Sequence, residues 1–152
     1  MLSLTKKTDY ALIALGYLAD RPDETVSARE IAAAFEMPAA LVMNILKTLH
    51  HAGMLLSTRG TKGGYRLTAD LGKVTMYELI EVLEGPVRLA ECVIREEPCG
   101  SDGAPCKIGR QCPIQGPIKA LHTKLVRFLK DVRLSEVVVA NGQTKRHAAM
   151  AN

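Results

Sequence analysis

Residues 27–68 read SAREIAAAFEMPAALVMNILKTLHHAGMLLSTRGTKGGYRLT and contain two short helical patterns followed by two short strand patterns. Ser27 and Glu30 form a capping-box sequence, which predicts a helix from residue 28 to about residue 35. Pro38 suits the first position of a further helix that ends before Gly53. Its apolar residues at helical spacing are Leu41, Ile45, Leu46 and Leu49. Two short helices joined by a tight turn are typical of a helix-turn-helix.

The two strand patterns flank a glycine-rich turn, residues 59–64, and predict a β-hairpin. An apolar helix is expected before this region, from Thr5 to Asp20, and a second capping box, Thr75 with Glu78, opens a helix after it. The sequence therefore predicts a mainly α fold. It is a winged helix-turn-helix with a small β-hairpin wing, followed by a long C-terminal dimerisation helix.

The C-terminal helix is expected from a heptad-like apolar seam. The seam consists of Ile114, Ile118, Leu121, Leu125, Phe128 and Val132. Fewer than three heptads do not separate a dimer seam from an ordinary core face. We favour a homodimer, because the small winged-helix unit has little core left to cover the seam. The predicted organisation is a DNA-binding domain (1–86), a cysteine-rich loop (87–113), a dimerisation helix with a short following helix (114–139) and a tail (140–152).

Composition excludes several classes of protein. The chain has 152 residues, of which 47% are hydrophobic and 24% charged, which argues against disorder over most of its length. No apolar run approaches the roughly 18 residues of a membrane helix. The net charge of +4 permits a nucleic-acid partner, and 4% aromatic residues argue against a base-stacking platform for single strands. Asp9 separates the basic and apolar residues near the start of the chain, which argues against a secretion signal there. We therefore expect a cytoplasmic protein.

Two parts of the predicted winged helix carry DNA-binding chemistry. The face of the third helix opposite its apolar stripe presents Ala40, Met43, Asn44 and Lys47, which we call the reading face. Asn44 suits an adenine edge, and Lys47 suits guanine or phosphate. Basic residues in the hairpin turn would approach phosphate or a narrow minor groove. The alternative is a solvated face of a protein–protein module. The predicted DNA-contacting residues are Lys6, Ser27, Pro38, Ala40, Met43, Asn44, Lys47, Arg59, Thr61, Lys62, Gly63 and Tyr65.

All four cysteines, Cys92, Cys99, Cys106 and Cys112, lie in the loop that precedes the C-terminal helix. Their spacing is neither the C-x2-C pairing of zinc fingers nor the C-x2-C-x2-C run of ferredoxins. From the residues alone, an iron–sulfur cluster, zinc and redox-active thiols all remain open. The hypothesis of a redox enzyme is weakened because the sequence has no C-x-x-C motif. His122 is interpreted as a residue of the helix surface.

These features together resemble the bacterial winged-helix regulators that include the iron–sulfur cluster regulator IscR and the nitric-oxide-sensing repressor NsrR. The resemblance runs over residues 1–139. It is carried by Leu4-Thr5-Lys6 with Tyr10-Ala11, by the wing Arg59-Gly60-Thr61-Lys62-Gly63-Gly64-Tyr65, and by three cysteines before a long helix. Leu83-Glu84-Gly85-Pro86 and Glu91-Cys92 look most like the branch that regulates iron–sulfur assembly operons.

The resemblance implies a homodimeric transcription regulator, a repressor and not an enzyme, that binds double-stranded operator DNA. An iron–sulfur cluster would set its operator affinity, in response to iron–sulfur or iron status, redox or nitric oxide. The family's ligands map to Cys92, Cys106 and Cys112, with the extra Cys99 as a candidate fourth and Gln115 where that branch has a histidine. A 2Fe–2S cluster is favoured over 4Fe–4S, and the iron–sulfur assembly machinery is its expected donor.

Three alternatives remain beside this reading. Two lie within the same class, a metal-free thiol-redox regulator and a zinc-dependent regulator. The third is an iron–sulfur or zinc carrier that uses the helix-turn-helix for docking to proteins. The predicted reading face also departs from some relatives, because Ala39, Ala40, Leu41 and Met43 replace more polar side chains. We therefore carry no operator sequence over from the resemblance.

Overall fold

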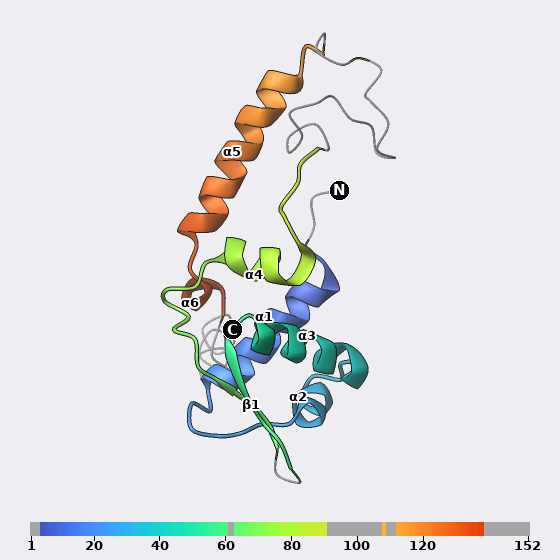
Figure 1. Cartoon of the computed structure of the whole chain (residues 1–152), viewed down its shortest axis with the longest axis vertical. Helices are drawn as coiled ribbons and strands as arrows, with labels where there is room; N and C mark the ends of the chain where they lie inside the picture. Colours follow the sequence, from blue (N-terminus) through green and yellow to red (C-terminus); the bar gives the residue numbers. More distant parts are fainter. Residues whose placement is uncertain (1–3, 61–62, 91–107, 109–111, 139–152) are drawn as a thin grey trace, which may run out of the picture.

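The computed structural model describes residues 4–60, 63–90, 108 and 112–138. The elements follow the order α1 (Lys6–Ala19), α2 (Ala28–Ala34), α3 (Ala39–His51), β1 (Leu55–Thr58), β2 (Gly64–Leu67), α4 (Met76–Glu84), α5 (Gln115–Asp131) and α6 (Leu134–Val137). Figure 1 shows α1 to α4, the hairpin and α6 gathered in one body, from which α5 projects. We call this body the head. The predicted fold class, a winged helix-turn-helix with a following C-terminal helix, is confirmed.

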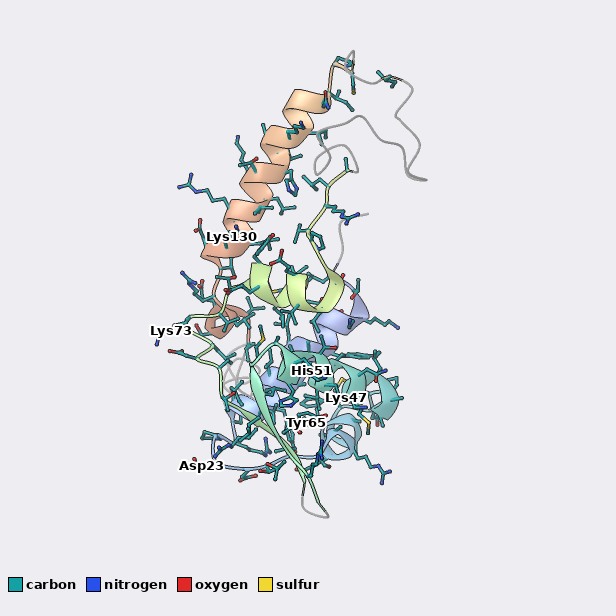
Figure 2. The ribbon with its side chains drawn as sticks, in the orientation of Figure 1. Asp23, Lys47, His51, Tyr65, Lys73 and Lys130 are labelled. Carbon is teal, nitrogen blue, oxygen red and sulfur yellow. The ribbon has the colours of Figure 1, made fainter. Side chains whose placement is uncertain are left out.

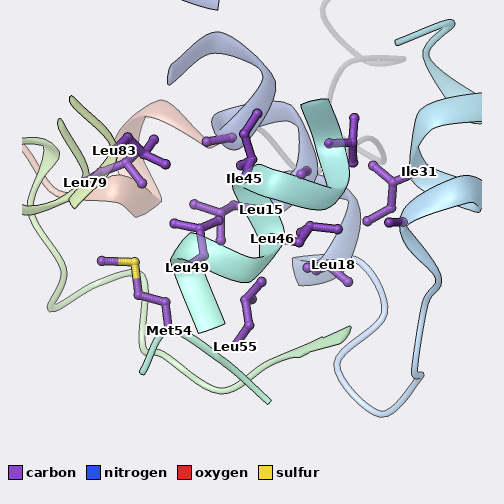
Figure 3. Close-up of a cluster of buried hydrophobic side chains, with 14 of the residues drawn as sticks. Leu15, Leu18, Ile31, Ile45, Leu46, Leu49, Met54, Leu55, Leu79 and Leu83 are labelled. Carbon is purple, nitrogen blue, oxygen red and sulfur yellow. The ribbon is translucent and has the colours of Figure 1, made fainter. Parts of the chain in front are cut away.

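The core of the head forms around the inner face of α3. Ile45, Leu46 and Leu49 are fully buried there, together with Val42. They pack with α1, α2, β1 and α4, as Figure 3 shows for Leu15, Leu18, Ile31, Leu55 and Leu79. Burial of a large aliphatic side chain is worth about 1.5–3 kcal/mol. Because one face of α3 is held in the core, its opposite face is held toward solvent.

Two details of the helix-turn-helix differ from the prediction. Pro38 is the N-cap of α3 and not its first residue, because its ψ of 114° is extended. The main-chain oxygen of Pro38 accepts hydrogen bonds from the N–H groups of Leu41 and Val42. Leu41 is only half-buried, and Val42 takes its place in the core. The buried positions 42, 45, 46 and 49 follow the 3.6-residue period closely, and position 41 lies at the edge of that stripe.

The turn between α2 and α3 passes through a left-handed backbone conformation at Glu36, with φ of 52°. This region favours glycine, and an L-residue pays roughly 1–2 kcal/mol there. The N–H of Met37, the next residue, donates to the main-chain oxygen of Ala32 at 2.9 Å, which closes the turn. Met37 itself is buried in the core. No glycine marks this turn in the sequence, so its conformation follows from the packing of α2, Met37 and α3.

The predicted hairpin is present and its register is regular. β1 pairs antiparallel with β2, with Leu55 opposite Leu67 and Thr58 opposite Gly64. Leu55 faces the core and is 3% exposed, whereas Leu56 points outward at 45% exposed. This alternation is that of a strand with one face on the core. The inner face fixes the base of the hairpin against α3.

The chain after α5 returns to the head. The N–H of Met76 donates to the main-chain oxygen of Val132, and the N–H of Leu134 donates to that of Val74, both at 2.9 Å. Leu134 is fully buried in the core. Val132, which the heptad pattern assigned to the seam, is therefore held by the head through its backbone and packs against the core. Residues 132–138 are part of the head in this structure.

α5 itself carries an uncovered apolar surface. None of its 17 residues, all of them described, is buried. Leu121 is 54% and Phe128 62% exposed, as is Ile114 just before the helix at 61%. Pro117 lies in the first turn of α5, where its missing N–H costs no intrahelical hydrogen bond. Over the residues described, no helix combines the length and the apolar character that crossing a membrane requires.

The predicted capping box at the start of α4 is formed in both directions, and it generates a prediction. The N–H of Glu78 donates to Thr75 Oγ1 at 3.1 Å, and the N–H of Thr75 donates to Glu78 Oε2 at 2.7 Å. These hydrogen bonds from Thr75 lower the pKa of Glu78 below its ordinary value of 4.5. The ionised form therefore stabilises the fold above pH 4.5, and this contribution is lost as the pH falls through the lowered pKa.

Thr75→Ala should lower the free energy of unfolding at pH 7 by about 1 kcal/mol, as for other lost N-caps. Glu78→Gln keeps a capping amide but cannot titrate, so the loss of stability below pH 4.5 should be smaller than in the wild type. Urea unfolding followed at several pH values measures both effects. Glu81→Gln, on the same helix, is the control. An acid dependence in Glu78→Gln equal to that of the wild type would contradict the assignment.

Candidate nucleic-acid interface

The reading face lies where the sequence predicted. Ala40, Met43, Asn44 and Lys47 are all exposed on α3, and Met43 is 37% exposed. Figure 2 shows Lys47 on α3. These residues stand at i, i+3, i+4 and i+7, so they form one continuous strip of the helix. The strip combines one amide, one cation and two apolar side chains, a set that can contact base edges, phosphate and thymine methyl groups.

The wing is tied to the helix-turn-helix by a backbone pairing that the sequence analysis missed. Val26 forms an antiparallel bridge with Tyr65, with hydrogen bonds of 2.9 Å and 2.8 Å between their main-chain atoms. Val26 is 1% exposed, and the next residue, Ser27, is the N-cap of α2. The wing and α2 therefore share one junction. A single apolar residue between Thr25 and Ser27 was the only signal for it in the sequence.

Close approaches of backbone to backbone explain two of the wing glycines, one of them at this junction. A Cβ atom on Gly64 would lie 2.4 Å from the main-chain oxygen of Val26. A Cβ atom on Gly63 would lie 2.4 Å from that of Thr58, across the hairpin. Contacts below 3.0 Å with backbone atoms cannot be relieved by moving a side chain, so both positions require glycine. Gly64 thus allows the close approach to Val26, and Gly63 allows the hairpin to close beside its turn.

The basic side of the wing is described in part. Arg59 is exposed at the end of β1, and Gly60 follows it with φ of 114°. The N–H of Gly63 donates to the main-chain oxygen of Gly60 at 3.0 Å. Thr61 and Lys62 lie outside the described residues. Tyr65 is half-buried, packs against the core and uses its backbone in the Val26 bridge, so its established contacts are structural.

A polar cluster links α1 to α2. Ser27 Oγ accepts from the N–H of Glu30 at 3.1 Å, which is half of the predicted capping box. The Glu30 carboxylate instead accepts from the Tyr17 hydroxyl at 3.3 Å. Arg21 stacks on the Tyr17 ring at 3.8 Å, and Phe35 meets that ring edge-on. Burial raises the pKa of Tyr17 above 10.0, so its hydroxyl stays protonated and donates.

The remaining predicted DNA contacts lie at helix ends. Pro38 and Lys6 are exposed, at the starts of α3 and α1, while Ser27 is half-buried at the start of α2. Free N–H groups at such ends favour phosphate. His50 at the end of α3 is engaged within the head, because its Nδ1 lies 2.9 Å from the main-chain oxygen of Leu55. The structure therefore leaves His51, which is exposed, as the freer of the two histidines.

The predicted cysteine ligands are described only at Cys112. Cys92, Cys99 and Cys106 lie outside the described residues. Cys112 is half-buried and free, and its main-chain oxygen accepts from the N–H of Gln115, the first residue of α5. Within the ranges that the structure covers, His, Cys, Asp and Glu side chains form no group of three that could hold a metal ion.

His122 differs from its interpretation as a surface residue. Its side chain is half-buried, and its Nδ1 is buried without a hydrogen-bond partner. It follows Gln115 by seven residues of α5, which is about 10 Å along the helix axis. That separation places it away from the start of α5, where Cys112 enters. The apolar residues of the seam next to His122 in the sequence gave no signal of its partial burial.

The geometry defines a class of protein. The helix-turn-helix packs in the core, exposes one strip of α3 and is joined to a β-hairpin wing. This combination is that of a winged helix-turn-helix DNA-binding module. The chain belongs to the Rrf2 family, described as iron-dependent transcriptional regulators, whose model matches residues 4–140. It is accordingly a DNA-binding transcription regulator and not an enzyme, and its partner is operator DNA.

One sequence relative and two solved structures show what the chain is similar to. The chain is 36% identical over 112 residues to the HTH-type transcriptional repressor NsrR of Streptomyces coelicolor, covering 72% of this chain and 74% of that one. CymR of B. subtilis, titled the global cysteine regulator, has a similar fold, with a TM-score of 0.65, 24% identity, and coverage of 91% and 97% of the two chains. T. potens IscR has a TM-score of 0.62 at 20% identity, with coverage of 90% and 85%.

Lys47→Ala and Arg59→Ala should each weaken binding to a specific DNA duplex. If each cation neutralises one phosphate, the slope of log K against log salt should become less steep by about 1. Fluorescence anisotropy titrations at several salt concentrations measure both quantities. Lys73→Ala is the matched control, because Lys73 is exposed on the side of the head away from Lys47 in Figure 2. Wild-type affinity and slope in Lys47→Ala would contradict the reading face.

Proposed function

We propose that this protein is a homodimeric repressor whose affinity for operator DNA is set by an iron–sulfur cluster bound to the cysteine-rich segment. The observation that carries the proposal is an arrangement in the chain. Four cysteines lie between α4, which packs in the DNA-binding head, and α5, whose apolar face is uncovered. A ligand bound by that segment acts between the part that contacts DNA and the part that sets the distance between two heads.

The dimer is supported by the exposed row on α5. Ile114, Leu121 and Phe128 are spaced seven residues apart and are each more than half exposed. Seven residues are close to two helical turns, so the three side chains form one line along the helix. The second row of the heptad pattern, Ile118, Leu125 and Val132, is half-buried. A second copy of α5 is the occupant that matches such a line, because the same stripe serves both partners of a two-fold interface.

The cluster is supported by the chemistry of the donors. Cysteine thiolates are the usual protein ligands of iron–sulfur clusters, and the family is described as iron-dependent. Cys112 lies three residues before the start of α5, so the positive end of that helix dipole favours a negatively charged neighbour there. Cys92, Cys106 and Cys112 are the proposed ligands, with Cys99 as a candidate fourth. A cluster bound there would supply a redox-active centre that oxidants and nitric oxide destroy.

The linkage between ligand and DNA follows from geometry. A dimeric helix-turn-helix protein needs its two recognition helices about 34–36 Å apart, one turn of DNA. Ligation of three or four side chains orders the segment that joins the head to α5, and this biases the spacing and tilt of the heads. Coupling of about 1–3 kcal/mol would change the operator affinity 5- to 150-fold.

The finer parts of the proposal concern the cluster and its signal. We favour a 2Fe–2S cluster that is delivered by the iron–sulfur assembly machinery and reports iron–sulfur or iron status, redox or nitric oxide. A metal-free thiol regulator and a zinc-dependent regulator share the same DNA-binding head and differ only in the cysteine segment. Metal analysis separates the three.

Protein purified without oxygen should be coloured and contain iron and acid-labile sulfide. Cys106→Ala and Cys112→Ala should lose the iron and the visible absorption, because each removes one thiolate ligand. A visible spectrum with iron, zinc and sulfide analysis measures this. Cys99→Ala is the matched comparison, and full retention of iron and colour there would remove Cys99 from the ligand set. A colourless wild-type protein that contains zinc and no sulfide would contradict the cluster.

Leu121→Asp and Phe128→Asp should convert a dimer into a 16.5 kDa monomer, because each places a charge in the proposed interface. Sedimentation at micromolar concentrations measures the mass. Lys124→Asp, on an exposed position of the same helix, should leave the dimer intact. The monomeric variants should also bind a two-fold symmetric site more weakly than the wild type. A dimer that persists in both apolar variants would show that the interface lies elsewhere.

A further inference from the structure

The first turn of α1 and the last turn of α4 cap each other through side chains. The Thr5 hydroxyl donates to Glu84 Oε1 at 2.6 Å, and the Thr8 hydroxyl donates to the same carboxylate oxygen. In the opposite direction, Lys7 Nζ donates to the main-chain oxygen of Leu83. We call these five residues, Thr5, Lys7, Thr8, Leu83 and Glu84, the α1–α4 clamp.

The charges of the clamp match the two helix ends that they meet. The positive end of the α1 dipole faces the Glu84 carboxylate, and the negative end of the α4 dipole faces the Lys7 ammonium. Thr5 is also the N-cap of α1, because its Oγ1 accepts from the N–H of Lys7 at 3.2 Å. Hydrogen bonds to ionised groups are shorter and about twice as strong as neutral ones. The clamp is therefore a strong joint between two elements 76 to 79 residues apart.

The two sides of the clamp differ in burial. Thr8 is 0% exposed, so its hydroxyl has no access to solvent and takes its partner from the protein. Glu84, by contrast, lies at the surface. A displacement of Glu84 therefore removes the carboxylate partner of a buried group in α1, and α1 packs directly against α3. A movement at the end of α4 would therefore change the environment of α1, the helix that packs against α3.

The clamp also lies at the point where the cysteine segment leaves the head. Glu84 is the last residue of α4, and Gly85 follows with φ of 85°. Pro86 and the cysteine-rich segment come next. On the other side of the joint, Lys6 is the exposed first residue of α1 and a predicted phosphate contact. Two residues thus separate the cysteine segment from a carboxylate that holds the DNA-binding head.

We propose that the α1–α4 clamp transmits the state of the cysteine segment to the DNA-binding head, with Glu84 as the positioning residue. The proposal rests on the proposed function, because it specifies the route of a cluster-dependent change in affinity. Ordering of the segment at Gly85 shifts Glu84 relative to Thr5 and Thr8. The first turn of α1 then moves with it, and with it the contacts of Lys6 and the support of α3.

The test compares affinities between two states of each protein. The probe is a DNA duplex selected from random sequences by the wild-type protein. Its Kd is measured for protein reconstituted anaerobically with iron and sulfide and for metal-free protein. The ratio of the two values should lie at about 5- to 150-fold in the wild type. It should fall toward 1 in Glu84→Gln and in Thr8→Val, which removes the buried hydroxyl without changing the shape of the side chain.

Glu81→Gln is the matched control. It removes one carboxylate from α4, one turn before Glu84, where Glu81 accepts from the Tyr77 hydroxyl at 3.0 Å and takes no part in the clamp. Its affinity ratio should equal that of the wild type. A second readout is independent of DNA. Amide hydrogen exchange in residues 7–9 should differ between loaded and metal-free wild-type protein, and this difference should disappear in Glu84→Gln.

The outcomes separate the two proposals. A wild-type ratio above 1 that persists unchanged in Glu84→Gln and Thr8→Val overturns the clamp as the route and leaves the proposed function standing. A ratio of 1 in the wild type overturns the proposed function, and the clamp proposal with it. If Glu84→Gln does not fold, Thr8→Val carries the test alone, since a change of hydroxyl to methyl keeps the packing of α1. Loss of the ratio in Glu81→Gln as well would show a general effect of α4 charge and overturn the specific role of Glu84.

Discussion

The burial of one face of α3 is the constraint on which the rest of the head depends. Ile45, Leu46 and Leu49 have no exposed surface, and α1, α2, β1 and α4 all pack around them. A helix held so completely on one side has no freedom to rotate about its axis. The amide and the cation of the reading face are therefore presented outward by the same packing that stabilises the fold. The core-forming face and the predicted DNA-contacting face are opposite sides of one helix.

The wing is positioned by backbone geometry and not by side-chain packing alone. Val26 pairs with Tyr65, and Gly64 allows the two backbones to approach. Because Ser27 caps α2 immediately after Val26, the wing and the helix-turn-helix are held at one point. Arg59 follows the strand of the hairpin whose partner strand is joined to the helix-turn-helix in this way. The arrangement gives a physical reason for Gly64, and the close turn of the hairpin gives one for Gly63.

The C-terminal part of the chain divides between two tasks. The backbone of Val132 and Leu134 pairs with the segment before α4, and the buried Leu134 anchors the return. α5 leaves its row of Leu121 and Phe128 uncovered. The head therefore holds both ends of the region that contains the cysteines and α5, one end at the α1–α4 clamp and the other at Leu134. Between these two ends, α5 also contacts the head directly, because it packs against α4 and Lys130 lies over the Tyr77 ring.

Local signals in the amino-acid sequence were enough to locate the elements and their chemistry. Capping boxes, the 3.6-residue apolar period and the glycine-rich turn located the helices and the hairpin, and the same periodicity identified the exposed face with Asn44 and Lys47, because these signals are local. Residues far apart in the chain were paired only by the tertiary structure. No local pattern encodes the separations of three pairings: the bridge between Val26 and Tyr65, the hydrogen bonds that Thr5 and Thr8 donate to Glu84, and the backbone pairing of Val132 with the head. The left-handed turn at Glu36 also followed from packing, since the cost at one residue is outweighed by the burial of the helices on either side.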